Sequence, residues 1–176
     1  MRSLSALFYV IFISIISISG KAFSQISVAA TLPIVTLLDI EPAGNITLSF
    51  AAPTEAGLPL VNPAVNTTKW INYTSAIAAG GLTRRVTASV NQVIPGINIR
   101  LQAAAASGSG GGTLGTPAAQ VTLTTTAVNI ITGIGGAFTG NGANNGHRLS
   151  ISLVPSTYGS ITSTNTPVVI TYTITE

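Results

Sequence analysis

The feature that most constrains this chain is an alternation of apolar and polar residues. It is clearest in residues 168–176, close to the C-terminus. Successive side chains of a β-strand point to opposite faces, so a period of two with β-branched and aromatic residues predicts a strand with one buried face. Pro167 suits the start of this strand, where a missing N–H costs little. The residues on the apolar face are Val168, Ile170, Tyr172 and Ile174.

A second alternating segment, residues 25–36, lies near the other end of the chain. Pro33 interrupts it, and a proline inside a strand indicates an edge or a bend. No other segment next to a terminus has comparable alternation, which makes it a natural counterpart for the C-terminal strand. Its apolar positions are Ile26, Val28, Ala30, Leu32 and Ile34.

Between these segments, shorter alternating stretches are separated by turn signals. Pro95 and Gly96 are expected to turn the chain between two strands of a hairpin. Residues 103–117 and 133–146 are rich in glycine and are expected to be loops. Strands are expected within residues 45–50, 69–74, 84–91, 97–101, 120–124, 128–131 and 148–153.

Many short strands and no amphipathic helix predict an all-β protein. We expect an antiparallel, Ig-like β-sandwich with Greek-key connections and about eight or nine strands. Residues 25–176 are long enough for one domain with its own core. Within that domain, residues 25–36 are a candidate for an exchangeable N-terminal strand.

The first 24 residues are expected to be a signal peptide. Arg2 supplies a short positive start, residues 6–18 form an apolar run, and small residues lead to a cleavage point before Gln25. The run is shorter than the roughly 20 residues that a membrane-spanning helix needs, so no stable span is expected after cleavage. The mature protein is therefore expected in the periplasm, on the cell surface or outside the cell.

Charge and cysteine content narrow the classes of function. Removing Arg2 and Lys21 with the signal leaves five basic and four acidic residues, a net charge of +1. This balance, without a clustered basic face, argues against nucleic acid as a partner. The chain has no cysteine, so no disulfide can stabilise it. An uncharged surface of Thr, Ser, Asn and Gly suits a protein that packs against copies of itself.

Catalytic and metal-binding residues are not expected, and neither is a cofactor. His147 is the only histidine and lies in a Gly/Asn turn without an orienting partner, so we interpret it as an exposed turn residue. Asp39 and Glu41 would share one face of a strand, but Ca²⁺ prefers six or more oxygen ligands, and a solvated strand end is favoured. The chain is therefore not predicted to be an enzyme.

Trp70 and Tyr73 are the candidates for carbohydrate contact, because aromatic faces stack on the apolar faces of sugars. Three positions apart in a strand, they would lie on opposite faces, so at least one is expected in the core.

Short motifs spread over most of the mature chain carry a family resemblance. They are the alternating N-terminus, Trp70-Ile-Asn-Tyr73, Pro95-Gly96 and a final Thr171-Tyr-Thr-Ile174. With the signal peptide, this layout resembles the exported pilin-type subunits of bacteria, including the fimbrial and spore-coat-U-like group of the chaperone-usher pathway. Many of those subunits have a disulfide, which this chain lacks.

The resemblance implies a structural surface protein that assembles by β-strand addition, in which one subunit fills a groove of the next. It implies that Ile26, Val28, Ala30, Leu32 and Ile34 form the donor face. Val168, Ile170, Tyr172 and Ile174 would then line the acceptor groove. The implied partners are copies of the chain or related subunits, a periplasmic chaperone and an outer-membrane usher.

Two interpretations of residues 25–36 remain open at this point. They can be a donor strand for the next subunit, or they can equally form the first strand of a complete monomeric sandwich, because both arrangements need the same alternation. A secreted monomer of this kind would be a binding module, either an adhesin or a carbohydrate-binding protein.

Overall fold

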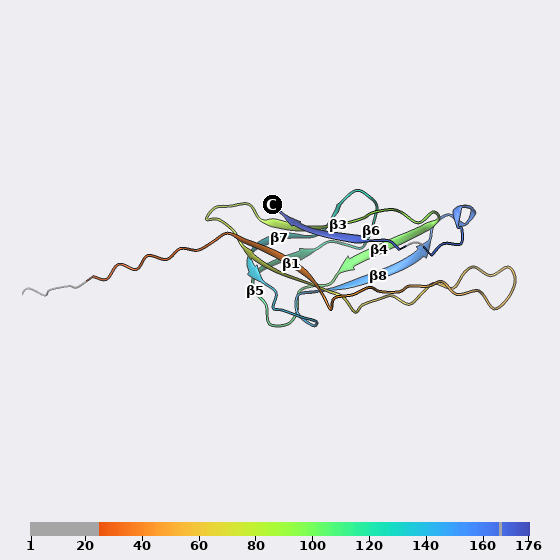
Figure 1. Cartoon of the computed structure of the whole chain (residues 1–176), viewed down its shortest axis with the longest axis horizontal. Coiled ribbons are helices and arrows are strands. Elements are labelled where there is room, and N and C mark those ends of the chain that lie inside the picture. The colour runs from red at the N-terminus through yellow and green to blue at the C-terminus, as the bar shows by residue number, and fades with distance from the viewer. Residues whose placement is uncertain (1–24, 166) are drawn as a thin grey trace, which may run out of the picture. The chain divides into compact units, whose positions relative to one another are not determined.

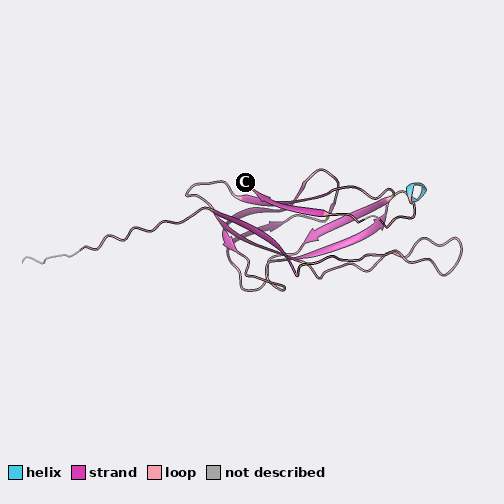
Figure 2. Ribbon diagram, viewed as in Figure 1, coloured by secondary structure: helices cyan, strands magenta, loops and turns pink. Residues whose placement is uncertain are grey.

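The structure of the protein is a computed structural model that describes residues 25–165 and 167–176; the expected signal peptide, residues 1–24, lies outside the described residues. The fold is all-β and antiparallel (Figures 1 and 2). A 3-10 turn, Tyr158–Ser160, is the one helical element of the described part. The strands are β1 (Val35–Glu41), β2 (Trp70–Ala76), β3 (Arg84–Val90), β4 (Ile97–Ala103), β5 (Gly111–Pro117), β6 (Val121–Thr122), β7 (Val128–Phe138), β8 (His147–Pro155) and β9 (Ile170–Thr175).

The nine strands form a continuous antiparallel sheet in the order β6-β4-β8-β2-β7-β3-β9, with β1 added to β2 and β5 added to β7. Strand β2 joins two branches of this sheet. Its residues 70–71 pair with β8, whereas residues 74–75 pair with β7. One branch therefore continues through β8, β4 and β6, and the other through β7, β3 and β9. This arrangement confirms the expected all-β, antiparallel class and the expected number of strands, and it is consistent with a sandwich-like fold.

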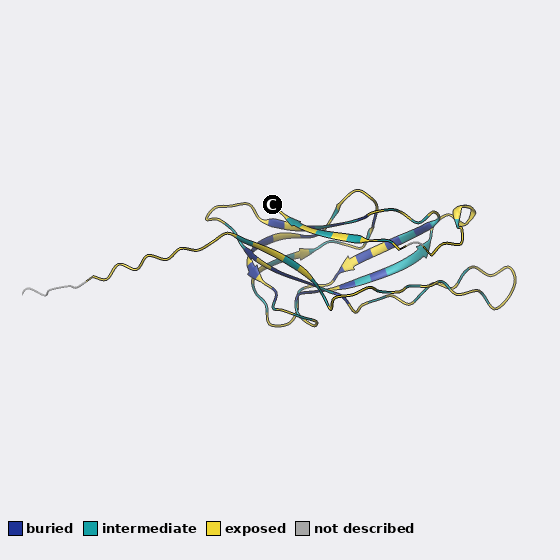
Figure 3. Cartoon of the chain, in the orientation of Figure 1, coloured by how far each residue is buried: buried dark blue, intermediate teal, exposed yellow. Residues whose placement is uncertain are grey.

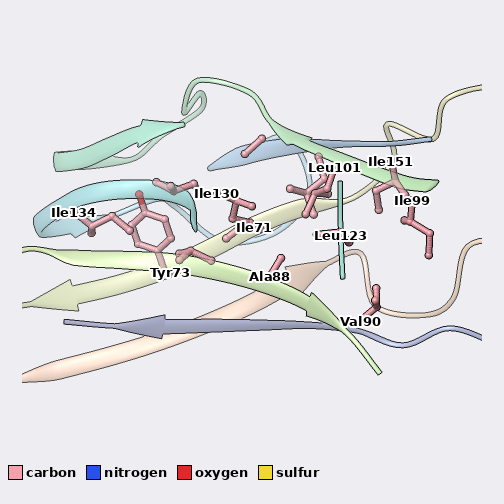
Figure 4. Packing of buried hydrophobic residues seen from close by; sticks show 14 of the residues in the cluster. Ile71, Tyr73, Ala88, Val90, Ile99, Leu101, Leu123, Ile130, Ile134 and Ile151 are labelled. Carbon is pink, nitrogen blue, oxygen red and sulfur yellow. The ribbon is translucent and has the colours of Figure 1, made fainter. Parts of the chain in front are cut away.

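The hydrophobic core is built from the alternating positions of these strands. In β3 the buried residues are every second one from Arg84 to Val90, and β4 alternates in the same way. Figure 4 shows the core side chains gathered between the strands. Burying each large aliphatic side chain contributes roughly 1.5–3 kcal/mol. The largest fully buried aliphatic residues are Ile71, Leu101, Ile130, Ile131, Ile134 and Leu149.

The expected strand within residues 25–36 is wrong over most of its length. No strand is assigned to residues 25–34, and β1 begins only at Val35. Val35 pairs with Ala76, the last residue of β2, so β2 offers no partner upstream of that point. The expected strand at residues 45–50 is absent as well, although Ile46 and Leu48 still pack against the core. Alternation indicates an extended chain with one apolar face. A β-strand also needs a neighbouring strand to hydrogen-bond with, and alternation does not show whether one is present.

Two glycine-rich segments that were expected to be loops contain strands. Strand β7 runs for 11 residues, from Val128 to Phe138, and β5 occupies Gly111–Pro117. The pairing of β7 with β3 and with β5 shifts register within this stretch, and Gly133 there has a φ of +72°. Glycine often marks a β-bulge, where one strand carries an extra residue. The glycines therefore bend β7 rather than end it.

The expected hairpin around Pro95 and Gly96 is also wrong. Strand β3 pairs with β7 and β9, whereas β4 pairs with β6 and β8, so the two strands belong to different branches. Gly96 has a φ of +74°, and its carbonyl accepts a hydrogen bond from Ser156 N at 2.7 Å. The turn thus carries the chain from one branch to the other.

Candidate assembly site

The N-terminal segment, residues 25–34, is exposed at every position (Figure 3). The apolar face of the segment is exposed as well: the exposed fractions are 87% for Ile26, 84% for Val28, 89% for Leu32 and 65% for Ile34. Ala30 is exposed too. The five donor candidates thus form an alternating apolar row without a strand assignment, and large apolar side chains in such a row favour association with another surface.

Strand β9 carries the acceptor candidates. Across the described residues it pairs with β3 alone, from Arg85 opposite Thr175 to Val90 opposite Ile170. One of its edges is therefore unpaired, and an unpaired edge offers N–H and C=O groups to another strand. The four candidates Val168, Ile170, Tyr172 and Ile174 pack against the core but are only partly buried. Burial raises the pKa of Tyr172, so its hydroxyl stays neutral.

Strand β1 provides a second incompletely used edge. It pairs with β2 from Val35 to Glu41 and contacts β9 without a ladder between them. Its inward residues, Leu38 and Ile40, are partly buried and pack against the same core as β9. Both strands therefore present half-buried apolar side chains where the ladder is incomplete.

A shallow hollow lies at the start of the β9 segment. It has a volume of about 100 Å³, and Val93, Ile94, Pro95 and Val168 are among its lining residues. A neighbouring hollow of about 270 Å³ shares residues 93–95 and extends to Leu123. The apolar side of β9 thus continues into a recessed surface beside Val168.

Arg84 connects these edges, and the sequence analysis did not single it out, because residues 84–91 were expected only to form a strand. Its side chain is buried; Nη1 donates to Val35 O at 2.6 Å and to Ser75 Oγ at 3.0 Å. Nη2 lies 3.6 Å from Glu176 Oε1. The guanidinium therefore joins the start of β1, the end of β2 and the end of the β9 segment. One feature of the sequence did indicate this burial: Arg84 lies two positions before Val86, so in a strand both side chains point to the same, buried face.

His147 is not the exposed turn residue that we expected. It is fully buried at the first position of β8, and its Nδ1 lies 2.8 Å from Ala104 O. Its Nε2 lies 3.0 Å from Tyr73 Oη and 3.2 Å from Leu114 O. Burial lowers the pKa of His147, while the two carbonyls oppose that shift. The prediction failed because glycines around a residue indicate its backbone freedom and not its burial.

Tyr73 is the core partner of His147. It is buried, its hydroxyl donates to Leu114 O, and its ring stacks on the imidazole with the centroids 5.7 Å apart. Burial raises the pKa of Tyr73. Trp70 points to the opposite face of β2 and is only partly buried, as the spacing predicted. Of the two carbohydrate candidates, Trp70 alone has a surface that a sugar can reach.

Asp39 and Glu41 lie on the outward face of β1, as their spacing predicted. Asp39 Oδ1 accepts a hydrogen bond from Ile40 N at 2.7 Å. Across residues 25–165 and 167–176, no group of three or more His, Cys, Asp or Glu side chains could hold a metal ion. Within the same ranges, no helix has the length and apolar character to cross a membrane.

Comparison with known proteins adds no further assignment. No protein-family model, curated protein or solved structure matches the chain.

Proposed function

We propose that this protein is an exported structural subunit of a surface fibre, and that its copies assemble by β-strand addition. Residues 26–34 of one copy would extend the sheet along the unpaired edge of β9 in the next copy. The main support is one observation: an exposed segment with alternating apolar residues occurs in the same chain as an unpaired strand edge with half-buried apolar residues.

The chemistry of the two partners is complementary. Strand addition needs backbone N–H and C=O groups on the edge and apolar side chains at alternate positions of the incoming strand. The incoming segment carries no charged residue between Gln25 and Ile34, and the facing side of β9 carries none between Val168 and Ile174. Pairing would therefore desolvate no charged side chain. In this proposal the export route uses a periplasmic chaperone and an outer-membrane usher, as in the family that the chain resembles.

Deleting residues 25–31 from the mature protein tests the proposal. The deletion keeps Val35, whose carbonyl Arg84 binds, so β1 should retain its position. We expect full-length mature protein to form fibres visible by negative-stain microscopy, and the deletion variant to stay monomeric with an unchanged circular dichroism spectrum. Fibres formed by the folded deletion variant would refute assembly through this segment.

A carbohydrate-binding module is the second candidate, and the position of Trp70 favours it. Trp70 lies between Glu41 on β1 and Arg148 on β8, directly opposite each in the ladder. Directly paired residues point to the same face, so an aromatic ring lies between a carboxylate and a guanidinium. Glycan-array binding that is lost in Trp70→Ala, but kept in Tyr158→Ala, would support this function for the monomer.

A further inference from the structure

The loop between β7 and β8 contains two Asn-Gly pairs in different surroundings. They are Asn141-Gly142 and Asn145-Gly146. An asparagine before a glycine is prone to deamidation, because the small glycine lets its own backbone nitrogen reach the side-chain carbonyl carbon of the asparagine. The local sequence thus makes both pairs reactive, and the structure decides which of them can react.

The second pair is held at both reacting groups. Asn145 Oδ1 accepts hydrogen bonds from Ser109 N at 2.9 Å and Ser109 Oγ at 3.1 Å, and its Nδ2 donates to Asn141 O at 2.8 Å. Gly146 N, the attacking atom, donates to Ser107 O at 2.9 Å. Gly146 is also buried so closely that a Cβ there would collide with Ile71 O. Ring closure at Asn145 would require several of these contacts to break.

The first pair is not held in this way. Asn141 is exposed, and across the described ranges no hydrogen bond engages its side-chain amide or the N–H of Gly142. The backbone around Gly142 is open as well, since a Cβ built there meets nothing within 4 Å. Both reacting groups of this pair are therefore free to approach each other.

We propose that Asn141 is a self-modification site whose only co-reactant is water. The backbone nitrogen of Gly142 attacks Cγ of Asn141 and loses its proton, the Cγ–Nδ2 bond breaks, and the amide leaves as ammonia. Water then opens the resulting succinimide at either carbonyl, which gives aspartate or isoaspartate at position 141. No oxidant or reductant is needed.

The product changes the contacts of the loop. Residues 140–146 carry no charge, and the reaction places a carboxylate among them. In the isoaspartyl product the main chain runs through Cγ, so the Asn141 carbonyl that accepts from Asn145 Nδ2 becomes part of a free carboxylate. Asn145 in turn holds Ser109, so the modification reaches the segment that leads into β5.

Incubation of the mature protein at mildly alkaline pH, followed by peptide mapping and isoaspartyl methyltransferase labelling, tests the proposal. In the folded protein we expect Asn141 to react roughly a hundredfold faster than Asn145, because several hydrogen bonds must open at Asn145 first. In denaturant the two rates should converge. Asn141→Gln should remove the label from the folded protein.

Two results would overturn this proposal. One is a rate at Asn145 equal to that at Asn141 in the folded protein. The other is an unmodified Asn141 in the folded protein under conditions where the denatured chain reacts.

Discussion

Arg84 is a buried cation whose partners all lie near the start of β1, where the exposed N-terminal segment joins the sheet. The guanidinium satisfies Val35 O and Ser75 Oγ and faces the half-exposed carboxylate of Glu176. Burying a charge without partners costs free energy. An ion pair with a half-exposed carboxylate contributes little, so the hydrogen bonds of Arg84 must offset most of its desolvation. Arg84 therefore has a structural role: it connects the start of β1, the end of β2 and the C-terminal residue that follows β9.

Replacing Arg84 by alanine should lower the free energy of unfolding by about 2–4 kcal/mol, because it leaves a void and unpaired buried oxygens. Arg85→Ala is the matched control, since the neighbouring side chain is exposed and should change stability by less than about 0.5 kcal/mol. Urea unfolding followed by circular dichroism measures both. Equal effects of the two substitutions would contradict the role given to Arg84.

His147 makes stability depend on pH. Its pKa in the folded protein lies below the 6.5 of a free histidine, so the unfolded chain binds the proton more readily. Stability should be constant above about pH 7 and fall below pH 6.5, with a slope of up to about 1.4 kcal/mol per pH unit. Urea unfolding between pH 7.5 and 5.5, above the usual carboxyl range of about 4, measures this dependence.

The control for this prediction is His147→Gln, which removes the only histidine of the chain. Its stability should be lower than that of the wild type at neutral pH, but it should vary little over the same interval. An unchanged slope in His147→Gln would assign the pH dependence to another group.

In the assembly that we propose, the N-terminal segment of one copy pairs with β9 of the next. The segment contributes little to the fold of one copy, because its side chains are exposed and β2 ends opposite Val35. Removing residues 25–31 should therefore change the free energy of unfolding by less than about 0.5 kcal/mol. Chemical denaturation of monomeric protein, at a concentration where no fibres form, measures this. A large loss of stability would indicate that the segment packs within its own copy.

The alternation of the segment predicts which substitutions would block the proposed assembly. Ile26→Asn with Val28→Asn should stop fibre growth, because the apolar face would carry buried amides without partners. The matched control is Ser27→Asn with Ala29→Asn, which places the same side chains on the other face. Light scattering during fibre growth compares the two variants. If both variants assemble like the wild type, the apolar face is not the contact.

At the scale of the whole molecule, the proposed assembly makes stability depend on a second chain. A peptide of residues 25–36 added to the variant without residues 25–31 should raise its melting temperature. At a hundredfold excess over its dissociation constant, the peptide should stabilise the variant by about 2.7 kcal/mol. A peptide of the same composition with the alternation scrambled is the control. Equal stabilisation by both peptides would rule out strand addition.

Most strand positions were predictable because alternation is a local property. The burial of β3, β4 and β9 follows the period of two that their sequences show. The glycine-rich stretches misled the prediction, since a glycine that permits a bulge in β7 has the same composition as one in a loop. His147 and Arg84 were missed for a related reason: their burial depends on strands distant in sequence.

The sequence by itself determined that this chain is all-β, where most of its strands lie and which side of each faces inward, because backbone geometry sets the period of two in every strand. Only the tertiary structure decided which strands pair and that β3 and β4 separate into two branches. It also decided that one edge of β9 has no partner strand among the described residues, while residues 25–34 are exposed. Strand pairing depends on contacts between residues far apart in the chain, and the alternation within one strand does not distinguish between its possible partner strands.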